Sequence, residues 1–236
     1  ANRVIFANAP PARNLAISAD LADRLAGADI FLVSGFNSIQ EPETLHERLA
    51  TVEAAASRMP TESLVVFEDA GYHRPELSTM ARSGVASFAD VCSRNEDELQ
   101  SLLGRKIDLL DDAEVEQALR DLVDVMAGPV HVVHTRYWSA AIGVGAERFR
   151  GALRGGIVMA STRYLHGDSL NAELYSRTSR LPRQPEALAF AARLTARLDV
   201  VVEPGLVLDT VAPTTIGLGD TFAGGFIAAL VKEQTR

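Results

Sequence analysis

Short apolar segments alternate with amphipathic segments along almost the whole chain. The apolar segments have strand length and are rich in β-branched or aromatic residues, which predicts strands over residues 3–7, 29–33, 64–67, 85–91, 130–134, 156–160 and 199–202. Helical spacing of apolar residues predicts helices over 15–25, 43–58, 95–103, 113–126, 184–198 and 220–233. This alternation favours an α/β fold with a doubly wound, mostly parallel sheet and helices on both faces.

Local signals support several of these boundaries. Pro42 lies at a predicted helix start, and Asp111 and Asp112 place acids in the first turn of another helix. Residues 163–185 are polar and bounded by prolines, which predicts an irregular surface segment. Neither an internal repeat nor a low-complexity linker divides the sequence, so residues 1–236 are interpreted as one domain.

Composition and charge exclude several classes of protein. With 47% hydrophobic and 23% charged residues, the chain can bury a core. Its net charge is −8 and it has no run of Lys or Arg, which argues against nucleic-acid binding. Cys92 is the only cysteine, which rules out an intrachain disulfide and fits a reducing cytoplasm. No apolar stretch reaches the roughly 18 residues of a membrane span, so we expect a cytoplasmic protein.

Polar residues or glycines follow most of the predicted strands. In open α/β sheets, ligands bind outside the carboxyl ends of the strands, so these residues are candidates for a binding site. They are Ser34–Asn37, Glu68–Asp69, Ser93–Asn95, His134–Arg136, Ser161–Arg163 and Glu203–Gly205.

The most informative segment is the turn that opens the last predicted helix. It reads Gly217-Leu218-Gly219-Asp220-Thr221, and its glycines allow backbone N–H groups to converge at the positive end of a helix. Such a turn binds phosphate. Asp220 beside it fits a general base that takes a proton from an attacking hydroxyl. The alternative is a glycine-rich loop in which Asp220 only caps the helix.

The longer string from Ile216 to Phe226 resembles the C-terminal signature of ribokinase-like sugar kinases. Its Gly-Leu-Gly-Asp-Thr form is similar to the ADP-dependent glucokinase and phosphofructokinase branch. Further similar segments occur in the same order as in that branch. They are Asn2–Ile5, Leu32–Phe36, Val66–Glu68, Asn95–Glu98 and His134–Thr135.

The resemblance implies a magnesium site. Glu68 matches the Glu of the family's His-x-Glu motif, although Val66 replaces the His, and Asn95 with Glu98 matches its Asn-x-x-Glu motif. Carboxylates together with water suit magnesium. The alternatives are a capping box for Asn95 and Glu98, and a solvated strand-end acid for Glu68.

The resemblance also implies a nucleotide site that includes Thr135, Arg136, Thr221 and Val211. Arg163 is a further candidate for phosphate, with exposed surface arginines as the alternative. Tyr137 and Trp138 either line the nucleotide site or pack in the core. His131 and His134 do not form a metal pair, because residues three apart on a strand point to opposite faces. We expect one of them to pack and His134 to face the edge.

Together these features predict a ribokinase-like glycolytic enzyme that moves the terminal phosphoryl group of ADP to a sugar or sugar-phosphate hydroxyl. Asp220 is the expected base, the N–H groups of Gly217, Leu218 and Gly219 stabilise charge, and Mg²⁺ is the cofactor. The alternatives are an ATP-dependent kinase and a degenerate nucleotide-binding protein without activity. Family members carry a longer N-terminal half, so we expect this chain to be a fragment. Neither the sugar nor the oligomeric state follows from the sequence.

Overall fold

A six-stranded sheet forms the centre of the computed structural model, which describes residues 16–126, 128 and 130–234. Its strands follow one another in chain order: β1 (Ile30–Val33), β2 (Leu64–Glu68), β3 (Val91–Asn95), β4 (Val130–His134), β5 (Trp138–Ile142) and β6 (Val201–Pro204). β1 to β4 pair in parallel, whereas β5 runs antiparallel to both β4 and β6. The sheet is therefore mostly parallel, and the strand predicted over 3–7 lies outside the described residues.

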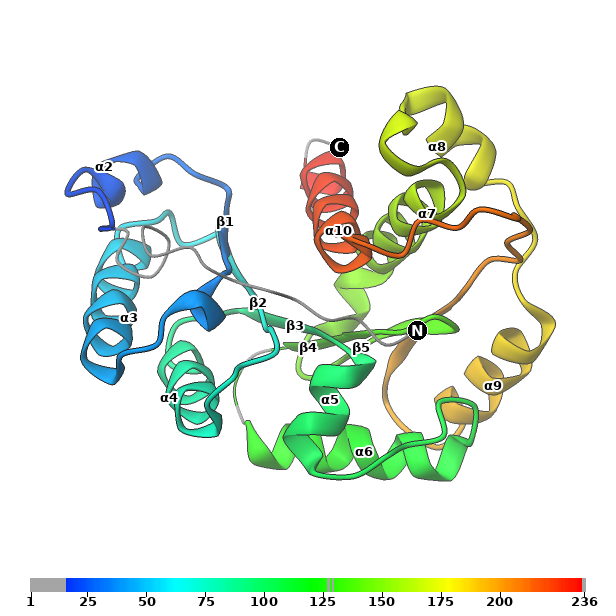
Figure 1. Ribbon diagram of the computed structural model, residues 1–236, viewed down its shortest axis with the longest axis horizontal. Helices are drawn as coiled ribbons and strands as arrows, with labels where there is room; N and C mark the ends of the chain where they lie inside the picture. The colour runs from blue at the N-terminus through cyan, green and yellow to red at the C-terminus, as the bar shows by residue number, and fades with distance from the viewer. Residues whose placement is uncertain (1–15, 127, 129, 235–236) are drawn as a thin grey trace.

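Helices cover both faces of this sheet (Figure 1). One face packs against α3 (Pro42–Ala56), α4 (Pro75–Val85), α5 (Glu96–Leu103), α6 (Asp112–Val125) and α9 (Pro185–Thr195). The other packs against α7 (Arg150–His166) and α10 (Leu218–Gln234). The shorter helices are α2 (Leu21–Leu25), α8 (Ala172–Thr178), η1 (Phe36–Ser38), η2 (Ala146–Phe149) and η3 (Gly167–Ser169). The predicted fold class is confirmed. None of the described helices is long and apolar enough to cross a membrane.

Two predicted strands are wrong for the same reason: apolar residues in each belong to a buried helix. Val85 ends α4, where Leu77, Ala81 and Val85 recur every fourth residue and are buried, and β3 begins only at Val91. Residues 156–160 lie inside α7, which packs against α10 on one side and against β5 and β6 on the other. A helix enclosed in this way is apolar over most of its surface, so its sequence resembles that of a buried strand.

Three further segments differ from the prediction. β5 has the sequence Trp-Ser-Ala-Ala-Ile, and its small central residues have a low preference for strands. Residues 163–185, predicted to be irregular, contain the end of α7 together with η3 and α8. The helix predicted over 15–25 is reduced to α2 within the described residues. The other predicted helices agree with the structure to within a few residues.

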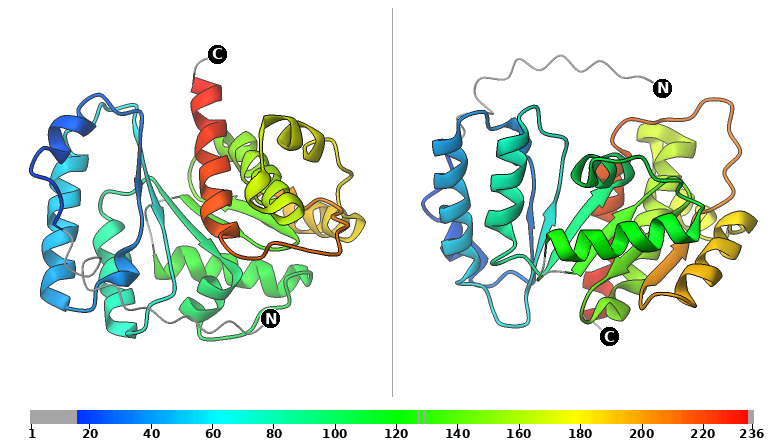
Figure 2. Two further views of the ribbon diagram at one scale, coloured as in Figure 1. Left: turned by 45° about the horizontal axis from the view of Figure 1, so that its top comes forward. Right: turned by 90° about the horizontal axis from the view of Figure 1, so that it is seen from below.

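The crossing of α7 and α10 explains Gly225 inside α10, and the left view in Figure 2 shows these helices side by side. A β-carbon on Gly225 would lie 2.5 Å from Cβ of Met159 and 2.6 Å from the carbonyl oxygen of Gly155. Gly225 therefore permits contact with another helix, rather than with the sheet or a ligand. Gly224 has open space around it.

Candidate active site

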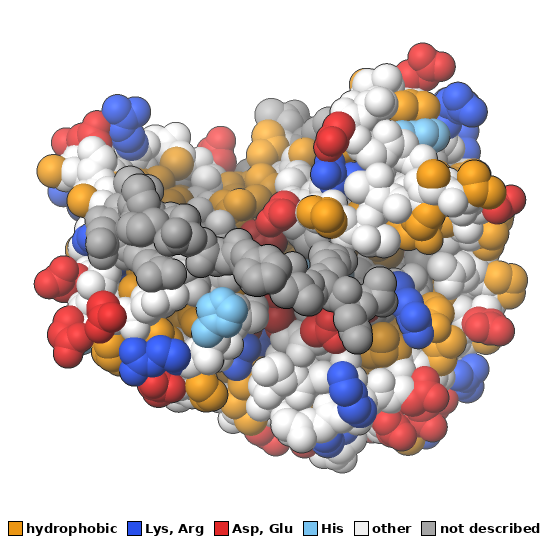
Figure 3. Space-filling view, viewed as in Figure 1, with side chains coloured by type: hydrophobic (Ala, Val, Ile, Leu, Met, Phe, Trp, Pro, Cys, Tyr) orange, Lys and Arg blue, Asp and Glu red, His pale blue; other side chains and the backbone are white. Residues whose placement is uncertain are grey.

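A cavity of about 780 Å³ opens at the carboxyl ends of the parallel strands. Its walls come from the segments after β1, β2, β3 and β4, from α7, and from the start of α10. The predicted strand-end residues that line it are Ser34, Gly35, Asn37, Glu68, Asp69, Asn95, His134, Thr135, Arg136, Ser161 and Gly205. The space-filling view shows acidic side chains near the middle of this face, beside α10 (Figure 3). The sheet thus brings together polar residues from most of the chain.

The first turn of α10 forms one wall of the cavity. Gly217 precedes it with φ 71°, and the backbone N–H and the hydroxyl of Thr221 both donate to the Gly217 carbonyl, at 3.0 and 2.5 Å. Gly217, Leu218, Gly219 and Asp220 all line the cavity. The first N–H groups of a helix have no acceptor within the helix, so this turn presents open donors there. Thr221 closes the turn and does not itself line the cavity.

Arg163 holds the segment that leads into this turn. Its Nε donates to the Ile216 carbonyl at 2.9 Å, and its Nη1 pairs with Asp168 at 2.8 Å. A β-carbon on Gly217 would lie 3.3 Å from Nε of Arg163 and would also meet the strain of a positive φ. Arg163, a candidate for phosphate binding, is instead engaged in fixing the loop.

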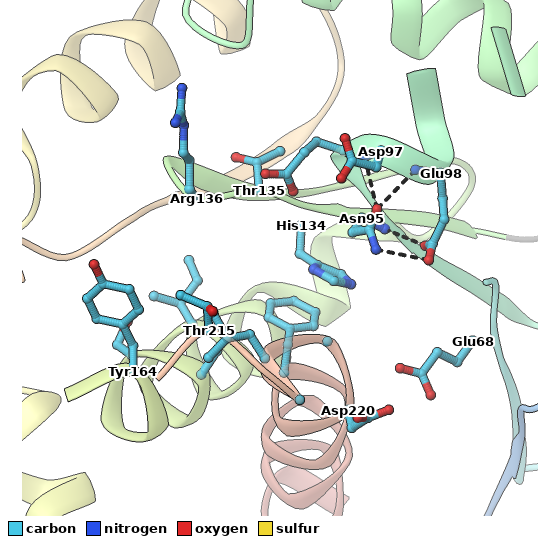
Figure 4. A pocket seen from close by; sticks show the side chains of 18 of the residues that line it. Glu68, Asn95, Asp97, Glu98, His134, Thr135, Arg136, Tyr164, Thr215 and Asp220 are labelled. Carbon is cyan, nitrogen blue, oxygen red and sulfur yellow. Dashed lines mark hydrogen bonds between the residues drawn. The ribbon is translucent and has the colours of Figure 1, made fainter. Parts of the chain in front are cut away.

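Three carboxylates line the cavity near one another (Figure 4). Asp220 belongs to the wall formed by α10, and Glu68 and Glu98 come from the end of β2 and the start of α5. Glu68 points toward Asp220, and its pKa is raised by burial first and then by the negative charge of Asp220. Burial also raises the pKa of Glu98 to about 7, with further contributions from Asp69 and Glu68. Within the described part of the chain, Glu68, Glu98 and Asp220 take part in no ion pair. No ion pair among the described residues therefore neutralises these three carboxylates.

Asn95 and Glu98 form the capping box that the sequence allows. The Asn95 side-chain oxygen accepts from the N–H of Asp97 and of Glu98, and Glu98 Oε2 accepts from the Asn95 N–H at 2.8 Å. The Asn95 amide also donates to Glu98 Oε1 at 2.9 Å, so both Glu98 oxygens are occupied. This arrangement leaves lone pairs for a water-mediated contact, and the described residues contain no group of three His, Cys, Asp or Glu side chains that could hold a metal ion.

Val66, which stands where the resemblance expects a His, is 2% exposed and belongs to the core under α7 and α10. It lies two residues before Glu68, on the same face of β2. The position therefore supplies apolar packing beneath the acidic group, and no polar atom.

The turn between β4 and β5 contains two of the predicted nucleotide residues. The Thr135 hydroxyl donates to the Trp138 carbonyl and accepts from the N–H of Tyr137 and of Trp138, so it mainly shapes the turn. The Arg136 guanidinium lies over the Tyr137 ring, 4.6 Å from its centroid. Arg136 is the only Arg or Lys among the described residues that line the cavity.

Three other candidates, Trp138, Val211 and His131, lie away from the cavity. Trp138 is buried, stacks on Phe190 at 5.5 Å and donates its indole N–H to the Leu109 carbonyl, so it packs in the core. Val211 is fully exposed and does not line the cavity. His131 is buried on the far face, within 2.7 Å of the Met126 carbonyl, whereas His134 faces the cavity. The expected division between the two histidines is confirmed.

Sequence reasoning missed several lining residues: Glu96, Asp97, Tyr164, Gln184, Leu206, Leu208 and Thr215. Glu96 and Asp97 lie inside the Asn95–Glu98 motif, so their position in a helix's first turn was a usable signal. Tyr164 and Gln184 had no such signal, because both lie within residues 163–185, which were predicted to be an irregular surface segment.

The sequence matches the model of a known protein family. The model of the conserved region of ADP-specific phosphofructokinases and glucokinases matches residues 1–228. No curated protein matches the chain.

Solved structures share the fold. A hypothetical ADP-dependent phosphofructokinase from Pyrococcus horikoshii OT3 aligns with a TM-score of 0.72 and 19% identity, over 92% of this chain and 54% of that one. The last common ancestor of the ADP-dependent phosphofructokinases from Methanosarcinales aligns with a TM-score of 0.79 and 15% identity, over 94% and 55%. The chain thus spans about half the length of these relatives. Because the family model covers nearly all of the sequence, the chain belongs to the ADP-specific phosphofructokinase/glucokinase family.

Proposed function

We propose that this chain carries the catalytic part of a kinase that transfers the terminal phosphoryl group of ADP to a hydroxyl of a sugar or sugar phosphate. The observation that carries the proposal is Asp220 on the first turn of α10, beside open N–H donors and facing Glu68 across the cavity. Family membership supports ADP as the donor. One relative is an ADP-dependent kinase in complex with fructose-6-phosphate and an ADP analogue, which supports an acceptor of the glucose or fructose 6-phosphate type.

Asp220 would act as the general base. Its carboxylate is exposed to the cavity and free of any ion pair among the described residues, so it can accept the proton of an incoming hydroxyl. The N–H groups of Gly217, Leu218 and Gly219 would donate to the phosphoryl oxygens as negative charge develops on them. These donors lie at the positive end of a long helix, which favours an anion at this point.

The acidic residues fit a hydrated magnesium ion. Glu68, Asn95 and Glu98 offer hard oxygen atoms, and the two carboxylates form no ion pair within the described residues. Because both Glu98 oxygens already accept from Asn95, Glu98 and Asn95 would hold the ion through its water molecules, and Glu68 is the most direct candidate ligand. Bound magnesium would neutralise charge on the donor phosphates.

Arg136 and Thr135 would border the nucleotide. The exposed guanidinium of Arg136 is the cation best placed to meet phosphate, while Thr135 keeps the turn in shape. Thr221 would act indirectly, by closing the turn before Asp220. A contact by Val211 requires the exposed loop before Gly217 to fold over the cavity. A glycolytic role in the cytoplasm belongs to the same proposal.

The test is a matrix of phosphoryl donors and sugars, run with the full-length gene product and with Asp220→Asn. We expect turnover with ADP and a hexose or hexose phosphate, loss of turnover in Asp220→Asn, and nearly unchanged ADP affinity. Turnover with ATP alone would identify an ATP-dependent kinase. Tight binding of magnesium and ADP without turnover on any sugar would identify a degenerate nucleotide-binding protein, a reading that the buried Val66 favours.

A further inference from the structure

Four aromatic rings form a continuous stack from the floor of the cavity to the start of α7. His134 at the end of β4 lies 4.3 Å from Phe222, with 22° between the ring planes. Phe222 lies 6.2 Å from Phe226 on the next turn of α10, and Phe226 lies 5.8 Å from Phe149, with 27° and 18° between the planes. The cavity end of this stack is the imidazole that lies beside the first turn of α10 (Figure 4).

Gly156 of α7 makes room for the Phe222 ring. A β-carbon on Gly156 would lie 2.6 Å from Cε2, 2.7 Å from Cδ2 and 2.9 Å from Cζ of Phe222, closer than such contacts occur in proteins. The end of a flexible side chain could move away from such a contact at little cost in free energy. Phe222 is 3% exposed and its ring packs between His134 and Phe226, so moving the ring away from position 156 would disturb the stack. A methyl group at position 156 must therefore shift the Phe222 ring, and we expect the first turns of α10 to move with it.

The residues that would move are those of the candidate active site. Phe222 is two residues after Asp220 in the same helix, so a shift of its backbone carries the first turn with it. His134 lies close to that turn, because a β-carbon built on Gly219 would lie 3.9 Å from Cε1 of the imidazole. Burial lowers the pKa of His134 to about 4, so the ring adds no positive charge near neutral pH.

We propose that Gly156 and His134 are positioning residues, which act through Phe222 to set the first turn of α10 against the cavity. The inference rests on the proposed function, in which that turn supplies the base and the phosphoryl-binding donors. It assigns to His134 the role of a flat uncharged support, and to Gly156 the role of the space into which Phe222 fits.

The first experiment compares Gly156→Ala with Gly224→Ala. Both replace a helical glycine by alanine, but Gly224 has open space around it and serves as the matched control. A misplacement of about 1 Å can cost about 100-fold in rate, so we expect Gly156→Ala to lower kcat for ADP-dependent transfer by about that factor. Gly224→Ala should stay within about twofold of the wild type.

A second readout needs no turnover. In ¹H–¹⁵N spectra of the free protein, the amide signals of Gly217 and Gly219 should shift in Gly156→Ala and stay in place in Gly224→Ala. Phe222→Leu makes space beside position 156, so adding Gly156→Ala to that variant should cost much less than adding it to the wild type. An equal cost in both backgrounds contradicts a path through Phe222.

The role of His134 is tested with one substitution that keeps a flat ring and one that removes it. We expect His134→Phe to keep the stack and most of the activity, and His134→Ala to lose about tenfold. If His134→Phe loses as much as His134→Ala, the imidazole nitrogens matter and the role assigned to His134 is overturned. If Gly156→Ala matches Gly224→Ala in both rate and spectra, the role of Gly156 is overturned. A wild type inactive with every donor and sugar contradicts the proposed function instead, and the amide shifts still decide the positioning.

Discussion

Two acids at the end of β2 follow each other in sequence and have opposite surroundings. Glu68 points into the cavity toward Asp220 and has no ion-pair partner among the described residues. Asp69 borders the same cavity, but its side chain is fully buried and turned away, with Oδ2 2.7 Å from Nε of Arg82 and 3.9 Å from Nη1 of Arg94. The difference follows from strand geometry, since neighbouring side chains point to opposite faces.

The comparison separates acids that hold the fold from acids left free for chemistry. Behind the sheet, Arg94 is fully buried and its charge needs Asp69, because a buried charge without a partner is costly. In the cavity, Glu68, Glu98 and Asp220 form no ion pair among the described residues. Burial first, and then the charge of neighbouring acids, raises the pKa of Glu68 and of Glu98. An enzyme keeps such an arrangement when a cation or a substrate completes it.

The largest expected effect is on catalysis, at the free acid of the helix turn. Asp220→Asn should lower kcat by about 10²- to 10⁴-fold, the usual contribution of a general base. Its side chain is exposed and unpaired in the described structure, so the unfolding midpoint should stay within a degree or two of the wild type (about 0.5 kcal/mol). Steady-state kinetics and thermal unfolding measure the two quantities. Turnover close to that of the wild type would sink the assignment of the base.

The compensated acid should show the opposite pattern. Asp69→Ala leaves Arg82 and Arg94 without their carboxylate and should lower the free energy of unfolding by about 3–5 kcal/mol, as for other broken buried ion pairs. Urea unfolding gives this value. Glu62→Ala, at an exposed position, is the control and should change stability little. A small loss for Asp69→Ala would contradict the division between the two acids.

His131, which is buried behind the sheet, should also control how the free energy of unfolding depends on pH. Burial, and next the charge of Arg94, lower the pKa of His131 to about 4, below its ordinary value. The unfolded chain then binds more protons than the folded one between about pH 6.5 and 4, so stability falls as pH falls through this window.

For His131 alone, the loss from pH 6.5 to pH 5 is about 1–2 kcal/mol. Unfolding measured at several pH values should show a flatter slope for His131→Gln. His134, with its pKa also lowered to about 4, should maintain part of the slope. A slope that does not change in His131→Gln contradicts the assignment.

The smallest effect is expected at Glu68. Glu68→Gln removes the proposed magnesium ligand but relieves the repulsion from Asp220, so the fold should be no less stable. The magnesium concentration that gives half-maximal rate should rise about tenfold, at the lower end for changes in a metal's surroundings. Glu62→Gln, a matched loss of charge at the surface, should leave that concentration as it is. An unchanged magnesium dependence in Glu68→Gln would remove Glu68 from the metal site.

Local features of the site were predictable, and distant ones were not. The capping box of Asn95 and Glu98 and the glycine turn before Asp220 involve residues only a few positions apart, so sequence spacing is enough to predict them. The engagement of Arg163 with the Ile216 carbonyl joins two segments far apart in the chain, and nothing near Arg163 indicates it. For the same reason Asp69 could not be distinguished from Glu68 until the positions of Arg82 and Arg94 were known.

The sequence by itself determined the fold class, most of the helices, the parallel strands β1, β2 and β4, and the Gly217–Asp220 turn, because these depend on periodicity and short-range geometry. Only the tertiary structure decided that residues 156–160 are helical, that Gly225 serves a helix crossing, and that Glu68 faces Asp220. These features depend on which surfaces meet after folding. Burial and charge compensation are properties of such neighbours, so they are absent from the linear pattern that predicted the elements.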